Sequence, residues 1–219
     1  MKTSLMIAAL LSLMISKSSH AAVVIDNLAT GSQSYSASLS GPSASIRFFG
    51  PFVNREVAFS FTSGSVDTLL TQFEFTTGVG AGTLNTIDVT LSTGILAPGG
   101  MNSILLGSVT PPSNSPGTQL LSISPALPPM LLANTLYWIH FTVPSGSSIY
   151  TISNSDAPVS APGWSLGSTW LQDPNNPWNE LNSGPLAKVR LTVDSIPEPS
   201  AALLGGIGLL LLLRRNRCA

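Results

Sequence analysis

The sequence predicts an all-β fold, an antiparallel β-sandwich of jelly-roll-like form, and three observations lead to it. Apolar and polar side chains alternate at every second position in several short segments, as in strands with one buried face. Clusters such as APGG, PPSNSPG and PSGSS separate these segments and have the composition of turns. No segment before the C-terminal end combines the 3.6-residue apolar period of a helix with capping residues.

Three segments alternate most clearly. Apolar side chains take every second position in REVAFSFTSG, NTIDVTLSTG and AKVRLTVDS, namely Val57, Phe59 and Phe61, then Ile87, Val89 and Leu91, then Val189, Leu191 and Val193. Less regular apolar runs predict further strands at 23–28, 69–76, 104–109, 120–124, 136–143 and 148–152. The stretch Gly78–Gly82 lacks the pattern of a phosphate-binding loop and predicts a turn.

The composition favours an exported protein rather than a cytosolic helical enzyme. Only 9% of the 219 residues are charged, while Gly and Pro number 19 and 17. This low share of charge is well under the usual quarter, and the profile is typical of a β-rich protein with many turns. The net charge of −1 gives no sign of nucleic-acid binding. Cys218 is the single cysteine, so the fold cannot contain an internal disulfide bond.

The first 21 residues read as a signal peptide. Lys2 supplies a positive start, Leu5–Ile15 is an apolar core, and Ser19-His20-Ala21 has small residues at both ends. This order predicts cleavage between Ala21 and Ala22. We therefore expect export of a β-sandwich domain that comprises residues 22–195.

The last 24 residues, 196–219, have three parts in order. Pro197, Glu198 and Pro199 form a motif that the proline rings hold in an extended conformation. Residues 201–213 are an uncharged apolar run that predicts a single transmembrane helix, at or below the lower limit of the usual length range. The basic tail of Arg214, Arg215 and Arg217 follows and predicts a cytoplasmic C-terminal end.

This order of parts resembles the PEP-CTERM sorting signal of Gram-negative bacteria that make exopolysaccharide. The resemblance implies that exosortase, a membrane-embedded enzyme similar to cysteine transpeptidases, recognises the signal. It also implies transient anchoring in the inner membrane, then removal of the helix and tail. The protein would end at the cell surface or in the extracellular matrix, associated with exopolysaccharide.

The exported part resembles the choice-of-anchor domains of bacterial surface proteins, with the R type as the first candidate. The phrase LLANTLYWIHF and the Trp-rich segments after it carry this likeness. The resemblance covers most of the exported part and implies no known activity.

The sequence predicts no catalytic residue, no metal site and no cofactor. His140 in LYWIHFTV is the only histidine after the signal peptide, and no G-x-S-x-G elbow is present. We interpret His140 as a structural strand residue, on the face opposite Ile139 and Phe141. The acidic residues Asp88, Asp156, Asp173 and Glu180 keep a secreted hydrolase open as the least favoured alternative, although nothing marks a catalytic pair.

Candidate ligand-binding residues lie in GWSLGSTWLQDPNNPWNEL, which reads as a turn-rich loop. It contains Trp164, Trp170 and Trp178 among amides and acids. The tryptophans could pack onto the sandwich, or could stack on sugar rings while polar neighbours bind the hydroxyl groups. A third interpretation gives Asp173, Asn175 and Glu180 to a calcium ion.

The prediction for the whole chain is a non-enzymatic surface or matrix protein. The alternative is a carbohydrate-binding module that uses the Trp-rich loop.

Overall fold

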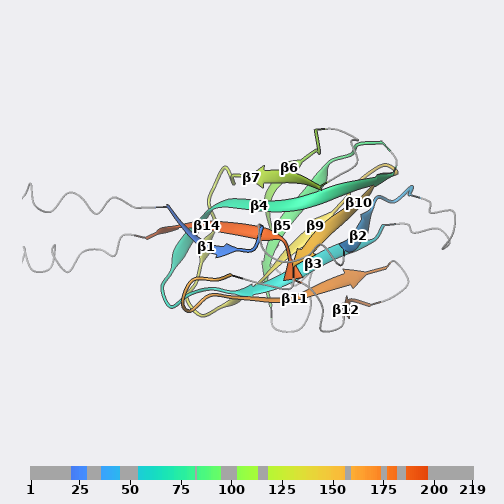
Figure 1. Cartoon of the computed structure of the whole chain (residues 1–219). Helices are drawn as coiled ribbons and strands as arrows, with labels where there is room; N and C mark the ends of the chain where they lie inside the picture. Colours follow the sequence, from blue (N-terminus) through green and yellow to red (C-terminus); the bar gives the residue numbers. More distant parts are fainter. Residues whose placement is uncertain are drawn as a thin grey trace, which may run out of the picture. The chain divides into compact units, whose positions relative to one another are not determined.

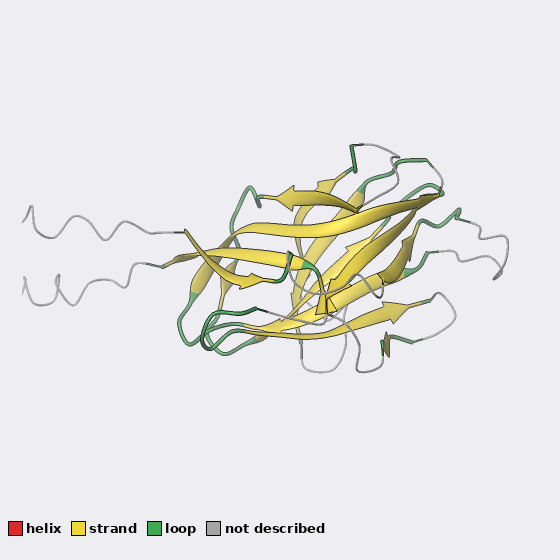
Figure 2. Cartoon of the chain, in the orientation of Figure 1, coloured by secondary structure: helices red, strands yellow, loops and turns green. Residues whose placement is uncertain are grey.

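A computed structural model describes residues 21–28, 36–44, 54–81, 83–94, 103–112, 118–155, 159–173, 177–181 and 186–196. These residues form strands, turns and loops, with no helix among them (Figure 2). Residues 21–194 form one compact unit. In the part of the chain that the structure describes, no helix has the length and hydrophobicity that a membrane crossing requires. The predicted transmembrane helix lies outside the described residues, as does the signal peptide apart from Ala21.

Two antiparallel sheets make up the unit, as the sequence predicts (Figure 1). The eight-stranded sheet contains β1 (Ala21–Asp26), β2 (Ser36–Ser40), β4 (Thr68–Ala81), β7 (Thr118–Ile123), β8 (Met130–Leu131), β10 (Ile149–Ser155), β13 (Leu186–Ala187) and β14 (Val189–Ser195). The six-stranded sheet has the order β12-β11-β3-β9-β5-β6. Its strands are β3 (Glu56–Thr62), β5 (Ile87–Thr93), β6 (Ile104–Val109), β9 (Leu136–Thr142), β11 (Ser165–Gln172) and β12 (Asn179–Glu180).

The alternating segments form strands because one side of each can be buried. In β3, β5 and β14 the predicted apolar positions are all buried. In β9, Ile139 and Phe141 are fully buried whereas His140 is partly exposed. The prediction that His140 lies on the face opposite these two residues is therefore confirmed.

Aromatic rings hold the two sheets together in a sandwich-like arrangement. Phe59 and Phe141 come from the six-stranded sheet, and Phe73 and Phe75 come from β4 of the other. The Phe75 and Phe141 ring centroids are 4.9 Å apart, and those of Phe59 and Phe73 are 6.1 Å apart. All four side chains are fully buried, so the core lies between the sheets.

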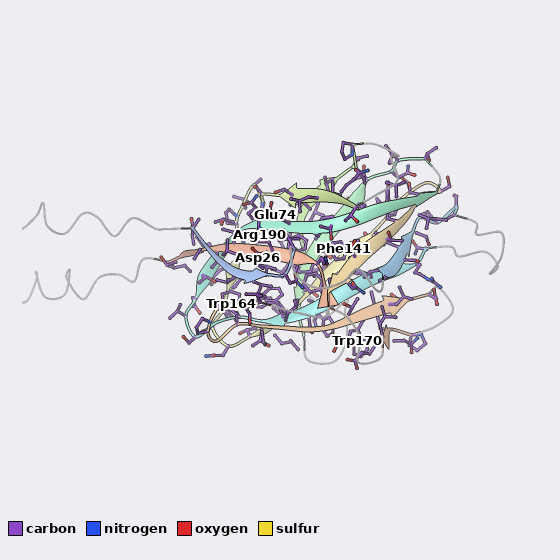
Figure 3. All side chains as sticks on the ribbon, in the orientation of Figure 1. Asp26, Glu74, Phe141, Trp164, Trp170 and Arg190 are labelled. Atoms are coloured by element: carbon purple, nitrogen blue, oxygen red, sulfur yellow. The ribbon has the colours of Figure 1, made fainter. Side chains whose placement is uncertain are left out.

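The outer surface of the eight-stranded sheet carries an ion-pair network. The Arg190 guanidinium on β14 lies 3.0 Å from Asp26 on β1 and 3.3 Å from Glu74 on β4 (Figure 3). These carboxylates raise the pKa of Arg190, with the Asp26 hydrogen bond as the main cause. The network links three neighbouring strands on the solvent side.

The turn prediction for Gly78–Gly82 is wrong for residues 78–81, because β4 continues to Ala81, and Gly82 lies outside the described residues. Gly78 pairs with Thr118 of β7 and also with Thr151 of β10. Ladder partners on both sides satisfy the backbone there and outweigh the low strand propensity of glycine.

The loop prediction for the Trp-rich segment is also wrong in part, because residues 165–172 form β11. Leu166 pairs with Phe61 and Thr169 with Phe59, so β11 contains one extra residue, a bulge. The bulge includes Gly167, where a Cβ atom would clash with Ser60 Oγ. The extra residue breaks the two-residue period by which a strand is recognised in a sequence.

Candidate functional site

The three predicted tryptophans do not lie together. Trp164 stands just before β11, and its ring stacks on Phe61 with centroids 6.3 Å apart and planes 15° apart. A Cβ atom on Gly64 would lie 2.5 Å from Trp164 Nε1, so glycine makes room for the indole. Trp164 therefore belongs to the edge of the core, which is the packing interpretation.

Trp170 lies on the outer face of the six-stranded sheet, near the other end of β11 (Figure 3). It pairs with Ala58 of β3, which pairs with His140 of β9, so these three side chains share one face. The ring of Trp170 meets that of Trp138 edge to face, with centroids 5.7 Å apart and planes 88° apart.

Trp138 is not among the tryptophans that the sequence predicts as ligand-binding residues. Its side chain points away from the core, yet only 4% of its surface is exposed. Its indole N–H donates a hydrogen bond to the carbonyl oxygen of Gly94 over 3.0 Å. The sequence pattern could have indicated its outward direction, because Trp138 lies between Tyr137 and Ile139 in a strand and these two neighbours are buried.

Trp178 packs against His140 across the sheet. Their ring centroids are 5.1 Å apart and their planes meet at 71°. Trp178 precedes β12, and both β11 and β3 lie between β12 and the strand of His140. The indole therefore reaches over β3, where the small side chain of Ala58 is fully buried.

Trp138, Trp170, Trp178 and His140 together form what we call the aromatic face. Charged groups border it at the start of β3. His140 Nε2 lies 2.9 Å from Glu56 Oε2, and Arg55 Nε lies 2.5 Å from Asp173 Oδ1. Trp170 and Trp178 remain partly exposed, so the face offers both aromatic surface and hydrogen-bonding groups to a ligand.

Among the predicted acidic residues, those that the structure describes are spread over this sheet. Asp88 on β5 accepts a hydrogen bond from Ser108 over 2.6 Å, and Asp173 pairs with Arg55. Glu180 is exposed on β12, while Asp156 and Asn175 lie outside the described residues. Within the described ranges, no group of three or more His, Cys, Asp or Glu side chains could hold a metal ion.

The residues of the sorting signal, Pro197, Glu198, Pro199, Arg214, Arg215 and Arg217, lie outside the described residues. The predicted cleavage point is described. Ala21 and Ala22 begin β1, where they pair with Asp194 and Val193 of β14.

Comparison with protein-family models found no family that matches this chain, and comparison with curated proteins found no similar sequence.

Proposed function

We propose that the chain is an exported, non-enzymatic cell-surface or extracellular-matrix protein. The observation that carries this proposal is the order of parts at the C-terminal end, Pro197-Glu198-Pro199, then the apolar run 201–213, then the arginines. The signal peptide supplies export, and the arginines keep the last residues in the cytoplasm. Exosortase is the proposed processing partner, with the inner membrane as a transient anchor and exopolysaccharide as the final surroundings.

The described unit supports this proposal in one respect. Because β1 lies beside β14, the predicted signal cleavage point and the exit toward the sorting signal are adjacent. The pairing of first strand with last also supports the jelly-roll-like connectivity, which we include in the proposal.

The test of sorting is deletion of the exosortase gene in the native host. We expect the mature protein to lose its C-terminal helix in the parent strain and to stay full length in the membrane of the deletion strain. Mass spectrometry of the mature C-terminus identifies the bond that is cut. A Glu198→Ala variant should reproduce the deletion phenotype in the parent strain. Full-length protein in the parent, or normal release without the enzyme, would contradict the proposal.

A second candidate function is carbohydrate binding by the aromatic face. The observation in its favour is that Trp170 and Trp178 are partly exposed beside the pair of His140 and Glu56. Indole rings stack on the apolar faces of sugars, and the imidazole and carboxylate can bind hydroxyl groups. The ligand class would be a neutral or weakly charged polysaccharide, such as the host's own matrix.

Retention on exopolysaccharide purified from the native host tests this second function. We expect Trp170→Ala to weaken binding at least tenfold, about 1.4 kcal/mol, because a stacking surface is removed. Leu120→Ala is the matched control, since this side chain is 54% exposed on the other sheet. Near-ultraviolet circular dichroism verifies that both variants are folded. Unchanged retention of folded Trp170→Ala would remove carbohydrate binding as a function of this face.

A secreted hydrolase remains the least supported alternative. A glycosidase needs two carboxyl groups that face each other across a substrate. Asp88 instead accepts a hydrogen bond from Ser108, and Asp173 forms an ion pair with Arg55. The two carboxylates lie toward opposite edges of the six-stranded sheet, near β5 and β11.

A further inference from the structure

The first and last residues of the compact unit lie side by side, at one end of the sandwich. Ala21 pairs with Asp194, so β1 begins where β14 finishes (Figure 1). The neighbouring strand β4 begins at this same end, because Thr71 near its start hydrogen-bonds to the carbonyl of Thr192 near the end of β14. β8 pairs with Thr68 and Leu69 at the start of β4 and therefore lies there too.

Exposed apolar side chains gather at this end, on β8, directly beside it and in the loop before β4. Val66 is 57% exposed, Leu127 86%, Met130 53% and Leu132 46%. We call these four residues the terminal rim. Two hydrogen bonds join the segment that precedes β4 to the segment that follows β8. Ala133 N–H donates to Asp67 Oδ1 over 2.8 Å, and Asn134 N–H donates to the Gly64 carbonyl over 2.8 Å.

The backbone of the terminal rim is fixed. Leu70 N–H donates to the Pro129 carbonyl over 3.0 Å, and Leu132 N–H donates to Tyr137 Oη over 2.6 Å. Leu131 is fully buried between the two exposed residues Met130 and Leu132. The outward direction of Met130 and Leu132 therefore follows the strand alternation on either side of Leu131, while Val66 and Leu127 lie in the turns next to it.

The sequence and the exit of β14 indicate what covers the terminal rim. β14 ends at Ser195, and the apolar run begins six residues later at Ala201. Six residues span about 20 Å when fully extended. If residues 201–213 enter a bilayer, as the proposed function requires, the end of the sandwich with the terminal rim must stay close to the membrane surface.

We propose that the terminal rim inserts into the outer leaflet of the membrane that holds the chain's own C-terminal segment. The segment from Pro125 to Thr135 contains no charged residue, and Asp67 in the facing loop already accepts a backbone hydrogen bond. Apolar insertion at the headgroup boundary therefore drives the contact, with little electrostatic attraction. The contact fixes the orientation of the anchored precursor, with the aromatic face on the side of the sandwich rather than at its membrane end.

Depth-dependent fluorescence quenching in vesicles tests this inference, which rests on the proposed membrane anchor. The chain, purified from membranes with its C-terminal segment intact, carries Cys218→Ser and one introduced cysteine, Leu127→Cys, labelled with an environment-sensitive dye. The vesicles contain phosphatidylethanolamine, phosphatidylglycerol and lipids with a quencher near the headgroup. The matched control is Leu120→Cys, an exposed leucine of β7 that pairs opposite Thr76 in the middle of β4.

We expect the dye at position 127 to be quenched by the lipid at least threefold more than the dye at position 120. Flotation of the vesicles separates the two proposals. Protein that does not float with the vesicles contradicts the anchor and this inference with it. Protein that floats with equal, weak lipid quenching at both positions leaves the anchor standing and overturns the inference. A dye at position 127 that is shielded from aqueous iodide but not quenched by lipid assigns the terminal rim to a second protein copy, and this result also overturns the inference.

Discussion

Two groups of aromatic side chains lie against opposite faces of the six-stranded sheet, and β9 contributes to both. The inner group consists of Phe59, Phe61, Phe73, Phe75 and Phe141, with all five rings fully buried. The aromatic face on the outer side contains Trp138, Trp170, Trp178 and His140. The inner rings carry no polar atom, whereas each outer ring carries a nitrogen that can hydrogen-bond.

The difference shows that strand alternation predicts where a side chain points but not why it is there. A solvated sheet face needs only polar side chains, as the eight-stranded sheet illustrates with Asp26, Arg190 and Glu74. The aromatic face has more apolar surface than solvation requires. Stability accounts for the inner group, while the partly exposed outer group is also suited to contact with a ligand.

The largest expected effect comes from Phe141→Ala in the inner group. Its ring contacts Phe59, Phe73 and Phe75 at centroid distances of 6.0, 6.0 and 4.9 Å. Removing it leaves a cavity between the sheets, so we expect a loss of about 3–5 kcal/mol in the free energy of unfolding. Urea unfolding measures it, and Phe141→Leu should lose less because it fills part of the volume. A loss below about 1 kcal/mol would show that the ring is not central to the core.

A smaller effect is expected at the edge of the inner group, for Gly64→Ala. The new methyl group would lie 2.5 Å from Trp164 Nε1 and displace the indole from Phe61. We expect a loss of about 1–3 kcal/mol in urea unfolding, as for other overpacked sites. Gly94→Ala is the control, because nothing lies within 4 Å of a Cβ atom there. Equal stability of the two variants would mean that Trp164 moves freely and does not close the core.

Much of the fold could be predicted from the sequence, because three of its strands keep a strict two-residue period. The apolar positions of β3, β5 and β14 were found in this way. β11 was missed because the bulge at Gly167 breaks the period, and β8 because two residues are too few to show one. The end of β4 was missed because its pairing with Thr118 and Thr151 is a tertiary effect.

The candidate site could be predicted only in part. Trp170 and Trp178 were selected for their spacing in a polar segment, and they do belong to the aromatic face. The sequence could not predict that Trp138 and Glu56 lie beside these two residues, because only the strand order β11-β3-β9 brings the side chains together. Trp164 was grouped with the others by spacing alone, and its contact with Phe61 depends on the turn that contains Gly163, which has a φ of +82°.

On the aromatic face, Trp170→Ala should cost less stability than any change in the inner group of similar size. The ring is only partly buried and packs on Trp138 through one edge-to-face contact. We expect a loss of about 1–2 kcal/mol in the free energy of unfolding, from the lost aromatic contact and the apolar surface that becomes exposed. A loss as large as that of Phe141→Ala in the same urea series would show that the outer group is a second core, as important for stability as the inner group.

The smallest effect concerns Tyr137, the neighbour of the inner group that carries a polar atom, and it depends on pH. The ring stacks on Phe61 at 5.5 Å, and its hydroxyl accepts the Leu132 N–H at 2.6 Å. Burial raises the pKa of Tyr137 above its ordinary value of 10.0. The folded chain therefore holds the phenol proton more tightly than the unfolded chain. This stabilisation is complete below about pH 10 and is lost as the pH rises through the folded pKa.

Tyr137→Phe should lower the free energy of unfolding by about 0.5–1.5 kcal/mol at neutral pH, because the hydrogen bond is lost. When the pH is raised from about 9 to about 11, the stability of this variant should fall less than that of the parent. Parallel stability curves for the two proteins over that range, measured by urea unfolding, would show that the phenol is equally solvated in both states and that the inner group reaches water at this edge.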